Sequence, residues 1–515
     1  MRALLSVANR EGIADLARAL TELGAELFAT DGTRAALAEA GVESHPISDL
    51  TGSESLAGGQ VKTFHANVYA GILARRQSDN EMAELAQRGI ELIDLVVVNV
   101  KPFAPQVGER AVPLDEAIEM IDVGGTALIT AAARNYAAVA AVSSPAHYAQ
   151  LTSELREMGS LTPEFRQRLA ADALADVAAY YAEVAAYLNH IAGMRFPNRL
   201  AVVVEKVRDL GYGQNPQQQA AFYRETTHRS GSLADAFQIQ GDQPTFNDLL
   251  DLDAAYRIAT DFTAPTCCIV KQGNPVGLAS NDRLVDAYQK ALEGDPVSAF
   301  GGVVAFNREV DTETANGVAG NAYEAVVAPS FSQPAREVLA EKQHLAVLAI
   351  RAEPFEGLSD YGIARLDFQR IDGGLLVETR DRSELDRSQL KVVTRRRPTL
   401  EELTDLLFGW RAVRHVTSNA VVLARNGALV GVGAGQASRL TAVEIALHKA
   451  ADRATMSVLA SDAYFPFADA IQLAAERGIT AIIQPGGSAR DQMAIEVADR
   501  HHMAMVFTGR RHYRH

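Results

Sequence analysis

Short apolar runs alternate with amphipathic segments in the N-terminal part of the chain, and this alternation constrains the fold more than any other feature. Ala3 to Val7 and Glu26 to Ala29 have the length and composition of strands, and Ile13 to Leu23 between them has apolar residues at helical spacing. The run Leu95 to Val100 is almost entirely apolar, as in a parallel strand covered on both faces. The pattern predicts an α/β fold in which ligands bind beyond the carboxyl ends of the strands.

The length of 515 residues predicts more than one domain. Thr162 and Pro163 suit the start of a helix, and the alanine-rich stretch from Glu164 to Leu188 has no Gly or Pro, which predicts a long helix closing the first domain. The break falls at Gly193 to Pro197. We therefore expect domains over residues 1–193 and 198–515, the second divided into lobes over about 199–365 and 366–515.

A charged stretch from Asp381 to Arg397 precedes Pro398 and Thr399, which suit the start of another helix. Runs of charge are most often solvated. We interpret this stretch as an exposed connector rather than as a partner site.

Composition excludes several classes of protein. A net charge of -15 argues against a protein that binds the nucleic-acid backbone, and no apolar stretch approaches the roughly 20 residues of a membrane span. The N-terminus becomes charged too early for a signal peptide. The two cysteines, Cys267 and Cys268, are adjacent and poorly placed for a disulfide. We expect a soluble, cytoplasmic protein with no nucleic-acid or membrane partner.

Several motifs occur once each, in the order known from one enzyme family. They are GGQVKTFHANVYAGILARR (58–76), IDVGG (121–125), KQGNP (271–275), DPVSAFGG (295–302), TSNAVVLARNGALVGVGAGQASR (417–439), SDAYFPFAD (461–469), and IIQPGGSARD with the terminal RRHYRH. Over almost the whole chain, they resemble the bifunctional enzymes of the last two steps of IMP synthesis, AICAR formyltransferase and IMP cyclohydrolase. The resemblance implies a methylglyoxal-synthase-like α/β domain followed by two cytidine-deaminase-like lobes. It also implies a homodimer with formyltransferase sites at the subunit interface.

The implied formyl transfer needs proton removal, oxyanion stabilisation and protonation of the leaving group, because the AICAR amine is a poor nucleophile. By the resemblance, Lys271 is the general acid or electrostatic partner, and Asn419 donates a hydrogen bond to the developing oxyanion. The formyl donor would be 10-formyltetrahydrofolate. Gln272 stands where the family normally has histidine, and glutamine can hold the carboxamide but cannot act as a base.

The resemblance also implies the residues around this centre. Those beside the nucleotide are Tyr212, Asn247, Gly301, Arg439 and Arg511, and those on the folate side are Tyr464 and Asp469. A second departure lies nearby, because Gly211 and Gln217 stand where the family usually has arginine and histidine. The H-x-E and P-C-x-x-C motifs of zinc deaminases are missing from the sequence, so we expect no catalytic metal.

The implied cyclohydrolase site has matches and departures too. Lys62 and Asp122 match the family's catalytic positions, whereas Gln60, Lys101 and Arg134 stand where arginine, tyrosine and lysine are usual. The substrate phosphate would lie in loops beyond the first two strands, whose amides and hydroxyls can cradle it. The residues implied there are Ser6, Arg10, Thr30, Gly32 and Thr33; alternatively, Thr30 to Thr33 is an ordinary turn.

Three interpretations remain open on the sequence. The first is an ordinary bifunctional enzyme in which water, the substrate phosphate or another side chain replaces the missing base. The second is a paralogue for an AICAR analogue, such as the aminopyrazole carboxamide ribotide of a C-nucleoside antibiotic pathway, because the substitutions cluster in both sites. The third is a non-catalytic nucleotide-binding homologue. Retention of Lys62, Asp122, Lys271 and Asn419 disfavours the third.

Overall fold

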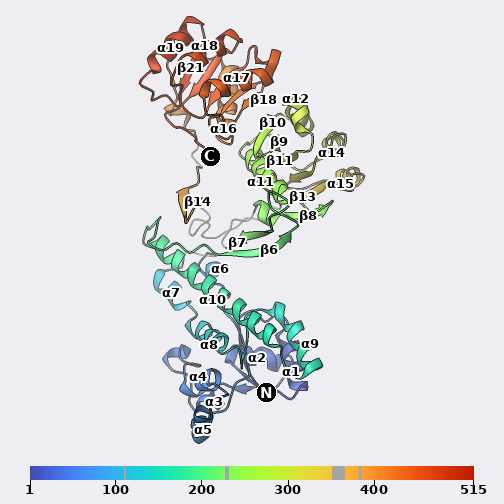
Figure 1. The fold of residues 1–515 in the computed structure, drawn as a ribbon, viewed down its shortest axis with the longest axis vertical. Helices are drawn as coiled ribbons and strands as arrows, with labels where there is room; N and C mark the ends of the chain where they lie inside the picture. Colours follow the sequence, from blue (N-terminus) through green and yellow to red (C-terminus); the bar gives the residue numbers. More distant parts are fainter. Residues whose placement is uncertain (109–111, 227–230, 351–365, 382–384) are drawn as a thin grey trace. The chain divides into compact units, whose positions relative to one another are not determined.

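The computed structural model of the protein describes residues 1–108, 112–226, 231–350, 366–381 and 385–515 (Figure 1). Two compact units are present, one over Met1–Val203 and one formed by the described residues from Val204 onward. Each unit has its own main sheet and its own hydrophobic cores.

The first unit is built on a five-stranded parallel sheet with strand order β3-β2-β1-β4-β5. The strands predicted at its centre are confirmed, although the apolar run ends one residue earlier than expected. The strands are β1 (Arg2–Val7), β2 (Glu26–Ala29), β3 (His45–Pro46), β4 (Leu95–Asn99) and β5 (Ala140–Val142).

Helices cover both faces of this sheet, as the apolar run predicts. Alternate residues of β4 enter different cores. Leu95 and Val97 pack with the helices α1 (Ile13–Glu22) and α9 (Tyr148–Met158), whereas Val96 and Val98 pack with α4 (Ala66–Leu73) and α8 (Val123–Arg134). The helices of this unit are α1 (Ile13–Glu22), α2 (Asp31–Glu39), α3 (Ser48–Thr51), α4 (Ala66–Leu73), α5 (Asp79–Gln87), α6 (Phe103–Gly108), α7 (Leu114–Glu119), α8 (Val123–Arg134), α9 (Tyr148–Met158) and α10 (Pro163–Ile191).

The predicted long helix is α10. The Thr162 side chain caps its first turn by accepting the Phe165 N–H at 3.3 Å, and Pro163 occupies the first helical position. Further along α10, Tyr180 and Tyr187 pack with Phe103 in a separate small core. This helix therefore serves both as a cover for the sheet and as the support of α6.

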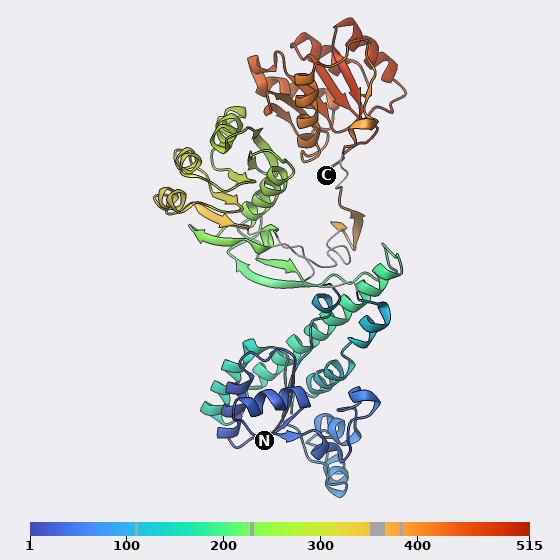
Figure 2. The same ribbon diagram turned by 180° about the vertical axis from the view of Figure 1, so that it is seen from behind.

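The second unit contains a twelve-stranded mixed sheet, seen from behind in Figure 2. Its two halves meet where β10 pairs with β18, at Ala279 and Ala428. One half contains β8 (Phe237–Gln240), β9 (Thr266–Lys271), β10 (Asn274–Ser280), β11 (Val303–Phe306), β12 (Ala325–Ala328) and β13 (Ala346–Ala349). The other contains β16 (Lys391–Val392), β17 (Val421–Arg425), β18 (Ala428–Gly433), β19 (Val458–Ser461), β20 (Ala481–Gln484) and β21 (Ala504–Phe507).

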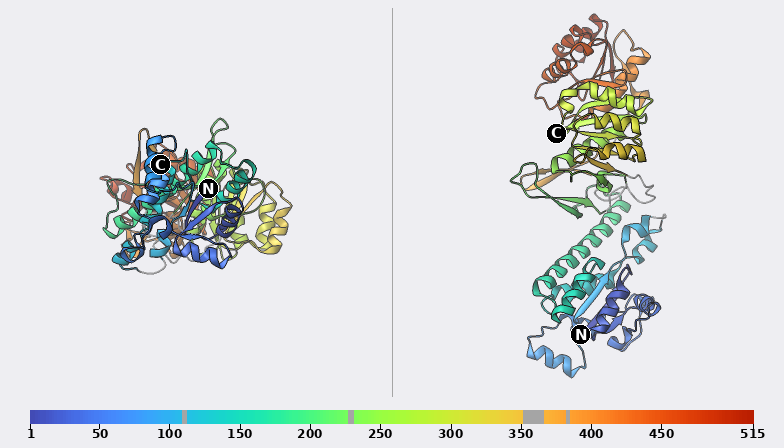
Figure 3. Two further views of the ribbon diagram at one scale, coloured as in Figure 1. Left: turned by 90° about the horizontal axis from the view of Figure 1, so that it is seen from below. Right: turned by 90° about the vertical axis from the view of Figure 1, so that its right-hand side faces the viewer.

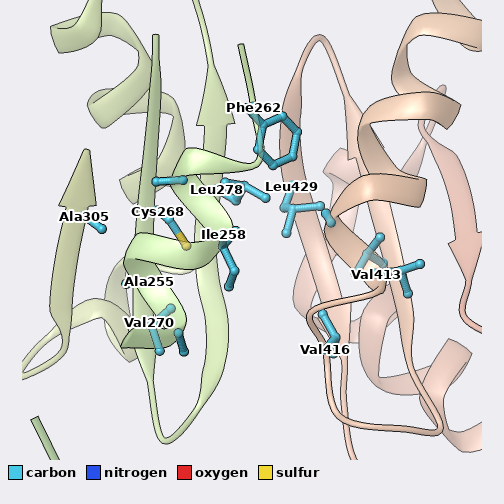
Figure 4. Packing of buried hydrophobic residues seen from close by; sticks show 14 of the residues in the cluster. Ala255, Ile258, Phe262, Cys268, Val270, Leu278, Ala305, Val413, Val416 and Leu429 are labelled. Carbon is cyan, nitrogen blue, oxygen red and sulfur yellow. The ribbon is translucent and has the colours of Figure 1, made fainter. Parts of the chain in front are cut away.

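In both halves, one edge strand is followed along the chain by a helix, an antiparallel hairpin and a second helix. In the first half these are α11 (Phe246–Thr260), β9–β10 and α12 (Leu284–Gly294); in the second they are α16 (Leu400–Val413), β17–β18 and α17 (Arg439–Ala450). One core runs through both halves, and Figure 4 shows Ile258 and Leu278 from the first close to Leu429 from the second. The remaining helices are α13 (Pro296–Ala299), α14 (Thr312–Ala319), α15 (Gln333–Ala340), α18 (Asp469–Glu476) and α19 (Asp491–Arg500).

Two antiparallel ribbons of this unit are separate from the large sheet (Figure 3). They are β6–β7 (Val204–Leu210 and Ala220–Glu225) and β14–β15 (Leu366–Ile371 and Gly374–Thr379). Cys267 and Cys268 lie in β9, where consecutive side chains point to opposite faces, and both are free and buried.

The predicted exposed connector from Asp381 to Arg397 is in part wrong. Lys391 and Val392 form the edge strand β16, which pairs with β21. The Arg396 guanidinium donates to both carboxylate oxygens of Glu402 at 2.8 Å and to the His502 carbonyl at 2.7 Å. A basic side chain in a run of charges is usually solvated. Here a carboxylate and a main-chain carbonyl accept hydrogen bonds from Arg396 instead. Residues 382–384 of this stretch lie outside the described residues.

The helix predicted after this stretch is confirmed as α16. Thr399 is its N-cap and forms a capping box with Glu402. None of the helices in the described ranges combines the length and the apolar content that a membrane crossing needs.

Candidate active sites

The most informative motif forms a tight hairpin turn. Lys271 is the last residue of β9 and pairs with Asn274 of β10, so Gln272 and Gly273 make a two-residue turn with φ angles of 52° and 75°. Positive φ at both positions is the requirement of a type I′ turn. The Asp251 carboxylate of α11 accepts the N–H of Gln272 at 2.8 Å and that of Gly273 at 2.6 Å. One carboxylate thus holds the turn that contains Gln272 and directly follows Lys271.

The second lobe has the same arrangement without the catalytic motif. Asn426 and Gly427 form the turn between β17 and β18 with φ angles of 52° and 70°. The Asp405 carboxylate of α16 accepts both of their N–H groups at 2.8 Å. Because the same clamp recurs at a turn that lacks Lys271 and Gln272, we interpret Asp251 first as a turn-forming residue.

Sequence reasoning missed Asp251, although a signal was present. Thr245 and Thr399 are the N-caps of α11 and α16, each with a capping box, and an aspartate stands six residues after each cap. Burial raises the pKa of Asp251, and the two accepted N–H bonds and the neighbouring Lys271 oppose that shift.

Lys271 and Gly301 are brought together by the structure. The Lys271 ammonium donates a hydrogen bond to the carbonyl oxygen of Phe300. Gly301 has a φ of 65°, and a side chain there would begin 3.7 Å from Lys271 Nζ. A residue other than glycine would therefore be strained and would fill space beside the ammonium group.

Asn419 approaches the same hairpin from the second lobe. The Asn274 side-chain oxygen accepts the N–H of Thr417 at 3.0 Å, which ties the β9–β10 turn to the segment that carries Asn419. The Asn419 amide donates to the Gln436 carbonyl at 2.7 Å, and its oxygen accepts from Arg439 Nη2 at 2.7 Å. Segments more than a hundred positions apart in the chain thus contact each other where the two lobes meet.

The other predicted nucleotide residues lie in two places. Asn247, at the start of α11, donates to the carbonyl of Gln214 at 3.3 Å and so contacts the loop that carries Tyr212. Arg511, in the C-terminal segment, is exposed and lies over the Tyr513 ring at 4.6 Å from its centroid. Arg439 differs from both, because its side chain is only 5% exposed and is paired with the buried carboxylate of Asp462.

The predicted folate residues lie close together in the chain. Tyr464 is 37% exposed, and Asp469 is the first residue of α18, where its carboxylate accepts the N–H of Ala470 at 2.7 Å. Nearby, the Arg490 guanidinium lies over the Phe467 ring at 4.6 Å from its centroid. This segment thus combines exposed aromatic rings with a guanidinium and a carboxylate group.

The predicted phosphate residues gather at the carboxyl end of the first unit's sheet. Thr30, the N-cap of α2, donates to the Ser6 hydroxyl at 3.2 Å, and the Thr33 hydroxyl accepts the N–H of Val7 at 2.9 Å. A side chain on Gly32 would begin 3.8 Å from the Arg10 guanidinium. The structure therefore brings together all five residues implied for the phosphate: Ser6, Arg10, Thr30, Gly32 and Thr33.

Asn99 holds one of these loops and was missed by sequence reasoning. Its side-chain oxygen accepts the N–H groups of Ala8 and Asn9, both at 2.7 Å, and its amide donates to the Asn9 carbonyl at 3.1 Å. The signal in the sequence is a single polar residue at the end of an apolar strand. Asn99 thereby shapes the loop that carries Arg10.

The predicted catalytic residues of this unit are only partly assembled. Lys62 Nζ lies 3.1 Å from the Asp31 carboxylate at the start of α2. Asp122 is the N-cap of α8, where its carboxylate accepts the Gly125 N–H at 2.7 Å and its own N–H donates to the Tyr180 hydroxyl at 2.7 Å. These bonds identify Asp122 as the N-cap of α8.

Arg134 and Lys101 are both exposed, and Gln60 is exposed as well. Arg134 is the last residue of α8, so the length of the helix separates it from Asp122 at the opposite end. A helix that connects two parallel strands runs back to the amino edge of the sheet. One chain therefore does not bring Arg134 to the loops that hold the predicted phosphate residues.

A cavity of about 700 Å³ opens elsewhere in this unit, between α1 and α9. Its lining includes Asn9, Gly12, Ser144 and Tyr148, but none of the five residues implied for the phosphate. Burial raises the pKa of Tyr148 to about 12, so its phenol stays protonated at neutral pH. In the described ranges, no group of three His, Cys, Asp or Glu side chains is arranged to hold a metal ion.

Comparison with known proteins agrees with the motifs. Residues 12–127 match the MGS-like domain family, and residues 132–449 match the family described as AICARFT/IMPCHase bienzyme. These matches confirm the predicted methylglyoxal-synthase-like domain and the formyltransferase region that follows it.

Relatives match along the whole chain. "Bifunctional purine biosynthesis protein PurH" of Desulfitobacterium hafniense (strain DSM 10664 / DCB-2) is 43% identical over 522 residues, covering 100% of this chain and 99% of the relative. The protein of the same name from Anoxybacillus flavithermus is 43% identical over 514 residues, with the same coverage. A solved structure titled "Crystal structure of ForH" is 38% identical, covers 36% of this chain and 96% of that chain, and has a TM-score of 0.32. The chain belongs to the AICARFT/IMPCHase bienzyme family and is a bifunctional enzyme of purine biosynthesis, combining AICAR formyltransferase and IMP cyclohydrolase.

Proposed function

We propose that each of the two units carries one reaction. Formyl transfer from 10-formyltetrahydrofolate to the AICAR amine takes place between the lobes of the second unit, and ring closure to IMP takes place at the phosphate loops of Met1–Val203. The observation that carries this proposal is the contact between Asn274 and Thr417, which joins the Lys271 turn to the Asn419 segment. The two groups that the chemistry needs thus come from different lobes.

In the formyl transfer, the AICAR nitrogen forms a bond to the formyl carbon, and negative charge develops on the formyl oxygen. Asn419 donates its amide N–H to that oxygen, while the bond to the folate nitrogen breaks and the leaving nitrogen takes a proton from Lys271. One N–H of the Lys271 ammonium is used by the Phe300 carbonyl, which leaves two for substrate.

The proton on the attacking amine needs another acceptor, since the Gln272 amide has no basic group at neutral pH. Water or the substrate phosphate takes it in this scheme. Gln272 instead holds the carboxamide beside the amine, and its backbone is fixed for this by Asp251.

In the ring closure, the carboxamide nitrogen attacks the formamido carbon, and water leaves after proton transfer. The cluster of hydroxyls and the start of α2 hold the phosphate, and Arg10 adds a positive charge. Lys62 stabilises the developing oxyanion, and Asp122 lies at the α8 N-terminus, where its carboxylate is oriented by the cap bond.

The substituted positions favour a second candidate for the substrate. Gln272, Gln217 and Gly211 depart from the family in the formyltransferase motifs, and Gln60 and Lys101 do so in the cyclohydrolase motifs. An AICAR analogue with an altered ring, such as an aminopyrazole carboxamide ribotide, would present different proton donors to both sites.

A paired assay decides between these substrates. The purified protein is given 10-formyltetrahydrofolate and either AICAR or the aminopyrazole analogue, and tetrahydrofolate release and the ultraviolet spectrum of the closed ring are followed. A higher kcat/KM for AICAR establishes the first substrate, and a higher value for the analogue establishes the second. Nucleotide binding by calorimetry without turnover of either compound would refute both and leave a binding protein.

We also propose a homodimer, supported by the two separate ribbons. Leu210 of β6 and Leu366 of β14 are buried, so one side of each ribbon packs against the protein. The ribbons nevertheless expose large apolar side chains: Val207 and Tyr223 in β6–β7, and Leu375 and Leu376 in β14–β15, each between 43% and 56%. A second copy would cover these apolar side chains. Sedimentation velocity should give about twice the monomer mass of 55.3 kDa, and a monomer at micromolar concentration would contradict the proposal.

A further inference from the structure

A buried ion pair lies behind Asn419. Arg439 is the first residue of α17, and Asp462 follows β19; their side chains are 5% and 0% exposed. Arg439 Nη1 donates to Asp462 and also to the carbonyl of Ala420 at 3.0 Å. The other oxygen of Asp462 accepts the hydroxyl of Ser418. The ion pair therefore reaches both chain neighbours of Asn419.

Arg439 also determines which way the Asn419 amide faces. A guanidinium has five donors and no acceptor, so the amide atom that faces Arg439 Nη2 at 2.7 Å is the oxygen. The amide nitrogen then lies on the other side, where one N–H donates to the Gln436 carbonyl at 2.7 Å. Within the described residues, no side chain or carbonyl accepts the second N–H from Asn419, which leaves it for a ligand.

We propose that Arg439 and Asp462 are positioning residues that hold the Asn419 amide in the orientation needed to donate to the formyl oxyanion. This inference rests on the proposed role of Asn419 in formyl transfer. The resemblance placed Arg439 beside the nucleotide, but both of its terminal nitrogens are bonded inside the protein. Arg439 contributes to catalysis by orienting the side-chain amide of Asn419.

The C-terminal segment braces the same network. Ser418 N–H donates to the Arg514 carbonyl at 2.9 Å, and the Arg514 N–H donates back to the Ser418 hydroxyl at 3.1 Å. The His512 N–H donates to the Asp462 carbonyl at 2.9 Å. Both ends of the positioning network are thus held by main-chain bonds, so the ion pair has little freedom to shift.

Arg439→Lys and Ser418→Ala test the inference in the full-length protein. Lysine keeps the charge opposite Asp462 but has no planar fork, so it cannot bond Asp462, Ala420 and Asn419 together. We expect kcat for formyl transfer to fall about 10- to 100-fold in Arg439→Lys and less in Ser418→Ala, because a misaligned oxyanion donor loses much of its effect. KM for the nucleotide should change by less than about twofold.

Arg396→Lys is the matched control. Arg396 lies in the same lobe and likewise donates to a carboxylate and to a main-chain carbonyl. These partners are Glu402 and His502, and neither belongs to the Asn419 network. Trp410, the single tryptophan, is buried in α16, so its emission reports whether this unit is folded in each variant. Cyclohydrolase turnover of the formylated nucleotide serves as an internal standard for the concentration of intact enzyme.

An unchanged kcat in Arg439→Lys would overturn the inference. A rise in KM at constant kcat would overturn it too, since Arg439 would then be a nucleotide ligand. A loss of kcat in the control as large as in Arg439→Lys would reduce the effect to general destabilisation and reject the positioning role. If the wild-type protein formylates neither AICAR nor its analogue, the proposed function fails first and the inference falls with it.

Discussion

At the scale of single residues, Gln272 has an unfavourable backbone conformation and a side chain that cannot act as the base expected at this position. Its φ of 52° lies in the left-handed region, where glycine, asparagine, aspartate and histidine are favoured over glutamine. The corresponding turn in the second lobe has Asn426 at this position. The turn therefore does not explain glutamine at this position.

Gln272→His should raise the rate of AICAR formylation. A histidine on this exposed turn would supply the missing base, and general-base catalysis typically contributes about 10²- to 10⁴-fold. Tetrahydrofolate release at saturating substrate measures the effect, and Gln272→Asn, which fits the turn without adding a base, is the control. A rate that stays at the wild-type value would show that the substitutions at Gly211 and Gln217 limit the reaction as much as the missing base at Gln272.

At the scale of elements, the recurring helix and hairpin separate a structural role from a catalytic one. Asp251 and Asp405 hold equivalent turns, but only the first turn contains Gln272 and follows Lys271. Asp251→Asn and Asp405→Asn should each lower the free energy of unfolding by about 1–3 kcal/mol, since two charge-assisted bonds are weakened. Urea titrations followed by Trp410 emission give these values.

The same two variants should differ in activity. Asp251→Asn should lower kcat for formyl transfer, because it loosens the turn beside Lys271, and Asp405→Asn should leave it within about twofold of wild type. Equal kcat values for the two variants would mean that the clamp of the first turn has no part in catalysis.

The junction of the two lobes predicts a dependence of stability on pH. The Nε2 atom of His415 lies 3.0 Å from a carboxylate oxygen of Asp261, which accepts the hydrogen bond and also pairs with Arg414. Burial lowers the pKa of His415 below its usual 6.5, although Asp261 acts in the opposite direction. As the pH falls below 6.5, His415 therefore becomes protonated in the unfolded chain but stays neutral in the folded chain. Protonation then favours unfolding, so this contribution to the free energy of unfolding is largest above pH 6.5 and decreases as the pH falls towards the folded-state pKa of His415.

Urea midpoints at about pH 7.5 and about pH 5.5 measure this contribution. The wild type should lose stability across the interval, and His415→Gln, which keeps a hydrogen-bond donor but cannot titrate, should lose less. The same loss in both proteins would show that other groups cause the pH dependence. Burial raises the pKa of Asp261, but its partners His415 and Arg414 lower it by more. Protonation of Asp261 therefore reduces stability only at more acidic pH.

At the scale of the whole molecule, the two units have separate sheets and cores, and this predicts separable activities. Lys62→Ala should abolish ring closure and leave formyl transfer within about twofold, and Lys271→Ala should do the reverse. Tetrahydrofolate release and conversion of the formylated nucleotide are measured independently. Loss of both activities in either variant would contradict separate sites.

Much of the fold was predictable because its signals are local. The apolar run at Leu95, the cap at Thr162 and the cap at Thr399 each act within a few residues, and the strands and helices appear where these signals place them. The exposed connector was mispredicted for the opposite reason. Arg396 is held by the distant carbonyl of His502 as well as by Glu402, and a pattern of charge along the chain contains no information about such acceptors.

The sequence by itself determined the family, the α/β class and the candidate site residues, because motifs and periodicity are properties of neighbouring positions. Only the tertiary structure decided which of these residues meet. It buries Arg439 on Asp462, places Arg134 at the far end of α8 from Asp122, and brings Asp251 to the Lys271 turn. Strand order and register decide such proximities, and they are set by packing of the whole chain rather than by any one segment.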